Sequence, residues 1–303
     1  KQMPVHEDAK NTIAFIEKSY KAGKPFYINL WLHEPHTPFH TLPKYRKRFP
    51  KLEDRDNIYA SVLSHADDRV GEVLNTLDRL KIADNTLVIF SSDNGPARMP
   101  SGFPLKTMHD TATGEGFNVA AAKGITGGRK GWKASLLEGG IGVPFIVRWP
   151  GKIAAGKVDK TSIFSAVDLL PTFCEIAGVK LPASYRPDGI SQVATLKGKG
   201  KVLREKPLFW KTLSTWPITR LKPDHWVSYA VVSKNWKLVT NRNTQYVELF
   251  DLVADPLERN DLKEKNPAMV NQLKKMLAQW QDTLPAKPTG NVFSNLRNPK
   301  KTK

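Results

Sequence analysis

The 303-residue sequence contains very little cysteine and no long apolar run. The single cysteine, Cys174, excludes a disulfide framework and a cysteine-rich zinc module. No apolar stretch approaches the roughly 20 residues that a membrane-spanning helix needs, so the sequence predicts no transmembrane segment. Hydrophobic residues make up 40% and charged residues 25%, which is close to globular averages and excludes a wholly disordered chain.

Acidic residues are scarce relative to basic ones. The 47 Lys and Arg residues against 29 Asp and Glu residues give a formal net charge of +18 at pH 7. A field of this sign attracts polyanions, which include nucleic acids, acidic membranes and sulfated or phosphorylated substrates. The basic residues are spread along the sequence, and neither zinc-ligand spacing nor a basic recognition helix is found. We therefore expect no nucleic-acid partner.

The N-terminal residues lack the pattern of a signal peptide. The sequence begins at Lys1, and no charged segment followed by an apolar segment comes next. Since translation begins with methionine, we expect this chain to be processed or to be part of a longer protein.

Apolar runs of strand length alternate with helical patterns in the first two thirds of the sequence. The runs cover residues 26–32, 86–90 and 143–149, and helices are predicted over residues 8–20 and 59–80. This alternation predicts an α/β fold with a mostly parallel sheet covered by helices. From about residue 206, short runs joined by tight turns and a final helix after Asn266 and Pro267 predict a smaller antiparallel sheet plus one helix.

These changes in pattern suggest three parts. We predict an α/β domain at residues 1–205, an antiparallel subdomain at residues 206–290 and a basic tail at residues 291–303.

Polar residues follow two of the predicted strands, where ligands bind in open α/β sheets. Asp93 and Asn94 are oxygen ligands suited to calcium or magnesium, although Asp-Asn-Gly is also common in turns. His36 is either a surface histidine or a group that contacts sulfate or phosphate or acts as a general acid. Lys133, in a glycine-rich and strongly basic stretch, is either a solvated surface charge or a group that binds an anion.

Taken in order, these segments resemble the sulfatase family of the alkaline phosphatase superfamily. The resemblance covers roughly residues 10–285 and rests on several segments. They are Pro-His-Thr-Pro at 35–38, Ser-Asp-Asn-Gly at 92–95, the segment 131–151 with its Glu-Gly-Gly, Asp-Leu-Leu-Pro-Thr at 168–172, and Leu-Phe-Asp-Leu followed by Asp-Pro-Leu-Glu at 249–258.

The resemblance implies a hydrolase of sulfate esters, either aryl sulfates or sulfated carbohydrates. Asp93 and Asn94 would ligate a divalent cation, usually Ca²⁺, with Mg²⁺ as the alternative. His36 would contact the sulfate ester and assist the leaving group. Lys133 would bind the sulfate and neutralise charge that develops in the transition state. Family habit also implies a periplasmic or secreted protein.

The sequence departs from the family at the nucleophile. The family uses a formylglycine made from Cys or Ser in a Cys/Ser-x-Pro-x-Arg motif, and this sequence has no such motif. The family's early Asp-Asp metal pair and the Lys-x-His pair after the nucleophile are also missing. In the family these features precede the segment at residue 24, so the chain resembles the C-terminal two-thirds of a sulfatase.

Several expectations follow from this incomplete resemblance. The α/β domain would lack its N-terminal part, and the chain would be inactive alone. The formylglycine would be supplied by a preceding segment or by a complementary N-terminal chain. The partner would be a sulfated small molecule or polysaccharide.

Two other functions stay open. A phosphomonoester or phosphonate hydrolase of the same superfamily is one, because the nucleophile that would help to decide is missing. A non-catalytic protein that binds sulfated glycans is the other. The missing nucleophile favours it, whereas the retained His36, Asp93, Asn94 and Lys133 argue against it.

Overall fold

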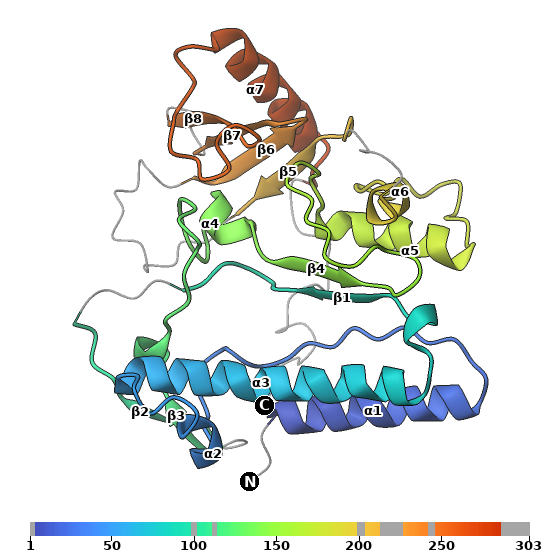
Figure 1. Cartoon of the computed structure of the whole chain (residues 1–303). Coiled ribbons are helices and arrows are strands. Elements are labelled where there is room, and N and C mark those ends of the chain that lie inside the picture. The colour runs from blue at the N-terminus through green and yellow to red at the C-terminus, as the bar shows by residue number, and fades with distance from the viewer. Residues whose placement is uncertain are drawn as a thin grey trace, which may run out of the picture.

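Helices and strands are mixed along the chain in this computed structural model, which describes residues 4–97, 102–110, 114–198, 204–212, 227–241 and 246–285 (Figure 1). The helices are α1 (Pro4–Lys21), α2 (Pro43–Arg46), α3 (Asp54–Arg79), α4 (Glu138–Ile141), α5 (Leu169–Ala177), α6 (Val193–Leu196) and α7 (Pro267–Asp282). The strands are β1 (Val88–Ser91), β2 (Thr107–Asp110), β3 (Gly114–Phe117), β4 (Phe145–Arg148), β5 (Leu208–Lys211), β6 (Tyr229–Ser233), β7 (Trp236–Thr240) and β8 (Val247–Asp251).

The described strands form three separate groups. β1 pairs with β4, β2 pairs with β3, and β5 to β8 form a four-stranded sheet in chain order. The predicted α/β class is confirmed, and so is the smaller antiparallel sheet with its helix. The expected parallel pairing is not found among the described strands, since each of these pairs is antiparallel.

The first predicted strand, residues 26–32, is extended but pairs with no other strand in the described part of the chain. Its side chains alternate between half-buried and exposed, and Tyr27 and Trp31 are 67% and 81% exposed. A strand of a parallel sheet is buried because other elements cover both faces of the sheet. Neither β1 nor β4 bonds to this segment, so its edges are unpaired within the described part of the chain, and the exposed Tyr27 and Trp31 show that one face is uncovered.

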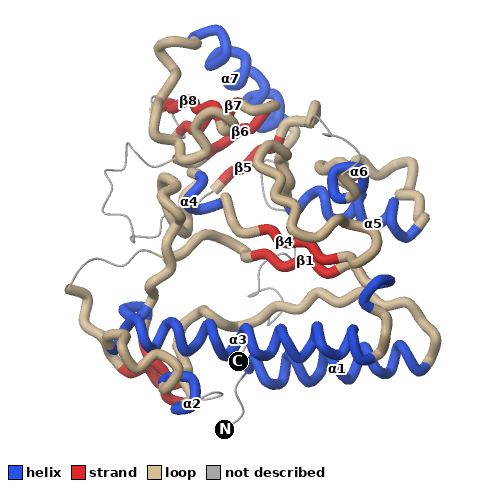
Figure 2. The backbone as a smooth tube through the Cα atoms, viewed as in Figure 1, coloured by secondary structure: helices blue, strands red, loops and turns tan. Residues whose placement is uncertain are grey.

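Helices α1 and α3 lie side by side below β1 and β4 in the view of Figures 1 and 2. Val5 of α1 and Ala66 of α3 are buried together, and Leu32 packs against them. One face of α3 is buried, as its periodicity predicts, although that face carries polar residues as well as apolar ones and Leu63 of the apolar repeat is 42% exposed. No described helix has the length and apolar character to cross a membrane.

Both faces of the C-terminal sheet are covered. Successive side chains of a strand point to opposite faces of the sheet, so neighbouring residues belong to two different apolar clusters, one on each face. One face packs on α7 through Val231, Leu238, Val247, Leu249, Leu273 and Leu277. The opposite face packs on the segment before α4 through Leu136, Val227, Ala230, Val239 and Phe250. This second contact places the C-terminal sheet directly behind the segment that carries Lys133.

The domain boundaries remain predictions. The sheet β5–β8 and α7 fall within the predicted subdomain at residues 206–290, and the predicted tail at residues 291–303 lies outside the described residues.

Candidate active site

Asp93 and Asn94 lie in the loop that directly follows β1. The backbone N–H of Asn94 donates to Oδ1 of Asp93 at 2.9 Å, and the side-chain Nδ2 of Asn94 donates to the carbonyl of Gly95 at 2.8 Å. These bonds close the turn on itself. They leave Oδ2 of Asp93 and Oδ1 of Asn94 without a hydrogen bond within the described ranges. The turn therefore presents two oxygen atoms that could bind a cation.

Lys133 lies half-buried in a compact loop that leads into α4. Gly131 and Ala134 have positive φ angles of +85° and +73°, and the backbone N–H of Ser135 donates to the carbonyl of Trp132 at 2.9 Å. The Ser135 hydroxyl accepts from the N–H of Leu137 at 3.1 Å. The ammonium group of Lys133 makes no ion pair with any described residue, so its charge is available to an anionic ligand.

Two backbone hydrogen bonds join the Asp93–Asn94 loop to the Lys133 loop. The N–H of Gly95 donates to the carbonyl of Gly140 at 2.8 Å, and the N–H of Lys133 donates to the carbonyl of Pro96 at 2.9 Å. A Cβ at residue 95 would lie 1.9 Å from the carbonyl oxygen of Gly139, which leaves room only for glycine. The structure thus brings these two predicted site segments together.

His36 is not joined to this pair of loops. Its Nδ1 lies 2.9 Å from the carbonyl oxygen of Thr37, and its ring meets the ring of His33 edge-on at 6.1 Å. No hydrogen bond or ion pair links exposed His36 to Asp93, Asn94 or Lys133 among the residues that the structure describes. Backbone hydrogen bonds therefore join the two loops that carry Asp93, Asn94 and Lys133, and no such bond joins the loop of His36 to them among the described residues.

The described residues fit only part of a calcium site. Asp93 and Asn94 offer oxygen donors, which is the right chemistry, but Ca²⁺ takes roughly six to eight oxygen ligands. The described part of the chain contains no group of three or more His, Cys, Asp or Glu side chains that could hold a metal ion. Further ligands would have to come from elsewhere.

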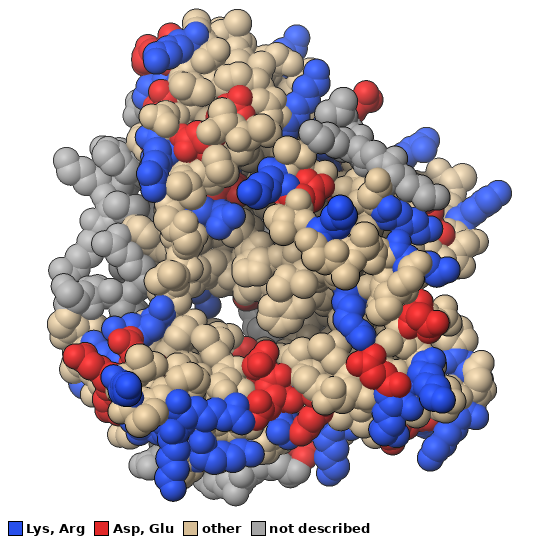
Figure 3. Space-filling view, viewed as in Figure 1, with Lys and Arg blue, Asp and Glu red and all other residues tan. Residues whose placement is uncertain are grey.

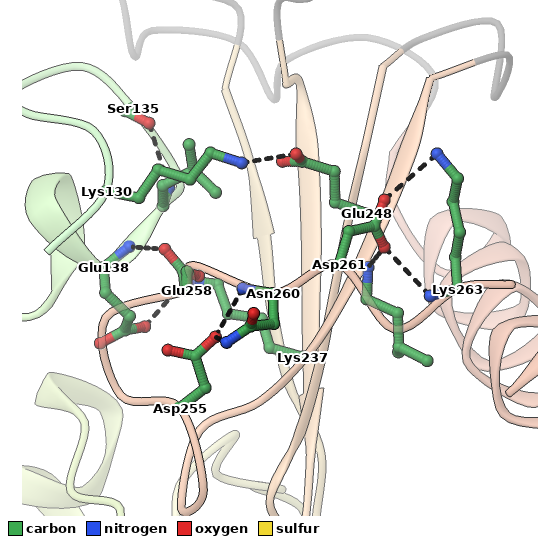
Figure 4. Close-up of polar contacts among 12 residues, drawn as sticks. Lys130, Ser135, Glu138, Lys237, Glu248, Asp255, Glu258, Asn260, Asp261 and Lys263 are labelled. Atoms are coloured by element: carbon green, nitrogen blue, oxygen red, sulfur yellow. Dashed lines mark hydrogen bonds and ion pairs between the residues drawn. The ribbon is translucent and has the colours of Figure 1, made fainter. Parts of the chain in front are cut away.

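A buried charge network behind the Lys133 loop was missed from the sequence (Figure 4). Lys237 of β7 places its Nζ 2.8 Å from Oε1 of Glu138 and 2.8 Å from Oε1 of Glu258. The backbone N–H of Glu138 also donates to Oε2 of Glu258 at 2.7 Å. Burial raises the pKa of Glu258 above its ordinary value, and the charge of Lys237 opposes that rise.

One sequence signal could have located this network. Lys237 interrupts the apolar strand Trp-Lys-Leu-Val-Thr, and Glu248 interrupts Val-Glu-Leu-Phe-Asp. Charged residues are almost never fully buried unless they are paired, so each charge in a buried strand predicts a partner. For Glu248 the partner is the ammonium group of Lys130.

Comparisons with known proteins decide the family. Residues 5–179 match the sulfatase family, and residues 128–283 match the C-terminal region of N-sulphoglucosamine sulphohydrolase. The chain belongs to the sulfatase family. The sulfatase resemblance seen in the sequence is thereby confirmed, whereas the individual roles of His36, Asp93, Asn94 and Lys133 stay predictions.

Two curated relatives and one solved structure are similar to most of this chain. N-acetylgalactosamine-6-O-sulfatase of Bacteroides thetaiotaomicron is 29% identical over 281 residues, which cover 89% of this chain and 50% of that protein. N-acetylgalactosamine-6-sulfatase of Sus scrofa is 27% identical over 310 residues, which cover 93% and 53%. The crystal structure of Ps i-CgsB matches with a TM-score of 0.72 at 25% identity, over 92% of this chain and 55% of that one. The chain spans about half the length of the curated relatives that it matches.

Proposed function

We propose that the protein containing this chain hydrolyses sulfate esters of carbohydrates. The observation that carries this proposal is the pair of hydrogen bonds that holds the Asp93–Asn94 loop against the Lys133 loop. Family membership and the names of the relatives support it, since two of them are sulfatases of N-acetylgalactosamine 6-sulfate groups. The net charge of +18 also favours an anionic substrate.

Each predicted residue has a chemical task in this proposal. The ammonium group of Lys133 binds a sulfate oxygen and stabilises the negative charge that grows as the S–O bond breaks. Asp93 and Asn94 would provide two of the ligands of a Ca²⁺ or Mg²⁺ ion, which when bound would supply positive charge to polarise the sulfate. His36 gives a proton to the leaving oxygen. The formylglycine nucleophile comes from a segment outside this sequence.

This division of tasks makes the 303-residue chain incomplete as a catalyst. Two oxygen donors hold calcium weakly, and no residue of the chain occupies the nucleophile motif. The isolated chain is therefore expected to bind metal weakly and to release no sulfate.

The proposal is tested by kinetics on the natural full-length protein and its Lys133→Ala variant. With N-acetylgalactosamine 6-sulfate and 4-nitrophenyl sulfate as substrates, kcat/KM is expected to fall by roughly a hundredfold or more in the variant. Lys152→Ala removes an exposed lysine after β4 and serves as the matched control, with unchanged kinetics. Equal rates for Lys133→Ala and wild type would contradict the role of Lys133.

The same assay separates the two alternatives. Faster turnover of 4-nitrophenyl phosphate than of the sulfate would identify a phosphomonoester hydrolase. Glycan binding without turnover, unchanged in Lys133→Ala and Asp93→Ala, would identify a non-catalytic binding protein.

A further inference from the structure

The Lys237–Glu138–Glu258 network is unusual in its burial. The side chains of Lys237 and Glu258 are fully buried, and that of Glu138 is 19% exposed. Burying charges carries a large desolvation penalty, and well-packed apolar side chains of similar volume are often equally stable in such a place. Net stability alone therefore gives little reason for three charges at this place. Their role is better sought in the positions that they fix in the neighbouring backbone.

That geometry is transmitted directly to the Lys133 loop. Lys237 and Glu258 fix both the carboxylate and the backbone N–H of Glu138, the residue that opens α4. The next residue, Gly139, donates its N–H to the carbonyl of Lys130 at 2.6 Å and thereby closes the Lys133 loop. Gly140 then accepts the hydrogen bond from Gly95. A continuous set of bonds thus runs from β7 to the turn that carries Asp93 and Asn94.

A second connection holds the other end of the Lys133 loop. The ammonium group of Lys130 pairs with Glu248 of β8 and lies 5.2 Å from the ring centroid of Phe250. The backbone N–H of Lys130 donates to the carbonyl of Leu257 at 3.2 Å. The loop is therefore bonded to the C-terminal sheet on both sides of Lys133 (Figure 4).

We propose that Lys237, through Glu138 and Glu258, is a positioning residue that holds Lys133 in register with the Asp93–Asn94 turn. This inference rests on the proposed function, in which Lys133 binds the sulfate group. Lys237 itself touches none of the predicted site side chains. Its effect passes through the backbone of residues 138–140.

The test uses a Lys237→Met variant of the natural full-length protein, studied well below its unfolding temperature. Misplacing a binding group by about 1 Å can lower a rate by about a hundredfold, so kcat/KM for 4-nitrophenyl sulfate is expected to fall by about tenfold to a hundredfold. Amide hydrogen exchange of the segments around Gly95 and Gly139 is expected to become faster, because both donors belong to the connecting set of bonds.

Lys263→Met is the matched control. Lys263 pairs with Asp261 in the same part of the chain, but the two side chains are 40% and 28% exposed and neither has a hydrogen bond or ion pair to the Lys133 loop among the described residues. This variant is expected to keep wild-type kinetics and wild-type exchange around Gly95. A purely structural role for Lys237 predicts a different result: Lys237→Met would lower the melting temperature while the folded protein kept its kcat, its KM and its exchange rates. That outcome would overturn the proposal.

A double variant, Lys237→Met with Glu258→Leu, covers the case in which Lys237→Met does not fold. It removes both fully buried charges and leaves only Glu138, which reaches solvent. The proposal predicts that this variant folds and shows faster exchange at Gly95 and Gly139. Unchanged exchange would contradict it.

The two readouts also separate this inference from the proposed function. If the wild-type protein releases no sulfate but Lys237→Met accelerates exchange at Gly95, the proposed function fails and the positioning role stands. If sulfate release is normal in both proteins and exchange is unchanged, the positioning role fails alone.

Discussion

Glycine residues set the distance between the two loops of the candidate site. A Cβ on Gly139 would lie 2.2 Å from the carbonyl oxygen of Gly131, and a Cβ on Gly140 would lie 2.2 Å from that of Ser135. Together with Gly95, these residues let three backbone segments approach within hydrogen-bonding distance. The Gly-Gly pair of the sequence is therefore a requirement of close packing, and backbone flexibility is not its main role.

Replacing Gly95 with alanine is expected to destabilise the protein. The new methyl group would overlap the carbonyl of Gly139, and overpacking of this kind lowers the free energy of unfolding by about 1–3 kcal/mol. Gly71→Ala is the control, because Gly71 lies in α3 with open space around it and alanine favours a helix by roughly 0.5–1 kcal/mol. Thermal unfolding should show opposite shifts, and equal stability of Gly95→Ala and wild type would contradict the packing account.

Replacing Asp93 with asparagine is expected to weaken calcium binding in the natural full-length protein. Loss of a carboxylate ligand should exceed the roughly tenfold to hundredfold loss typical of outer-shell changes. Isothermal titration with CaCl₂ measures this directly. Asp84→Asn, an exposed carboxylate that precedes β1, should bind calcium like wild type. An unchanged affinity in Asp93→Asn would remove Asp93 from the metal site.

At this scale the sequence was informative where chemistry follows a strand. Asp93 and Asn94 could be proposed as site residues because they follow β1, and Lys133 because it lies in a segment that resembles the family, and their roles stay predictions. The charge of Lys237 within an apolar strand indicates a buried partner, but the partners themselves could not be assigned, because Glu138 is about a hundred residues away in the sequence and only the folded chain brings it to Lys237 and Glu258.

Among the elements, α1 and α3 meet at a pair of histidines. Nε2 of His65 lies 2.6 Å from Nε2 of His6, and the ring of Tyr45 stacks on His65 at 4.5 Å. Burial lowers the pKa of His65 to about 4, and the positive charges of nearby residues act in the same direction. His65 is therefore neutral in the folded protein at pH values where an unfolded histidine takes up a proton.

Acid is expected to weaken the protein through this histidine. Because the pKa is about 4 in the folded state and about 6.5 unfolded, the contribution of His65 is complete above pH 6.5 and is lost as pH falls to 4. The free energy of unfolding falls by about 3 kcal/mol over this pH range through His65. Urea unfolding between pH 7.5 and pH 4.5 should show a weaker pH dependence for His65→Phe than for wild type. Identical slopes for His65→Phe and wild type would contradict this account.

The sequence predicted the helix α3 well and the strand at residues 26–32 poorly. The periodic repeat of α3 predicted its burial, because one helix face meets α1 and α2. The apolar run at residues 26–32 predicted a strand buried on both faces, yet Trp31 within it is 81% exposed. In β4, another apolar run, Ile146 is 60% exposed. The apolar composition of such a run indicates that it is stable when buried. It does not show whether the helices or strands that would cover the run lie within these 303 residues.

These exposed apolar residues are expected to make the isolated 303-residue chain associate. Unpaired extended segments with large apolar side chains are a common cause of aggregation. Light scattering should show less association for a Trp31→Ser, Ile146→Thr double variant. Val158→Thr changes a residue that is 78% exposed outside these strands and should have no effect. A monomeric wild-type chain would contradict the expectation.

At the scale of the whole molecule, the positive charge favours an anionic substrate, and the length of the chain compared with its relatives bears on where the activity resides. Figure 3 shows basic side chains interspersed with acidic ones over the visible face, both on the helices at the bottom of the view and on the C-terminal part at the top. A spread of this kind gives long-range attraction for anions and leaves the selection of a substrate to the site itself. The chain matches about half the length of its curated relatives, so the activity belongs to the whole protein in our account.

The most direct test of that account is sulfate release from N-acetylgalactosamine 6-sulfate in the presence of Ca²⁺. The natural full-length protein and residues 1–303 alone are compared at equal concentration by ion chromatography. We predict steady sulfate release by the full-length protein and none by the isolated chain. Sulfate release by the isolated chain, or none by the full-length protein, would contradict the account.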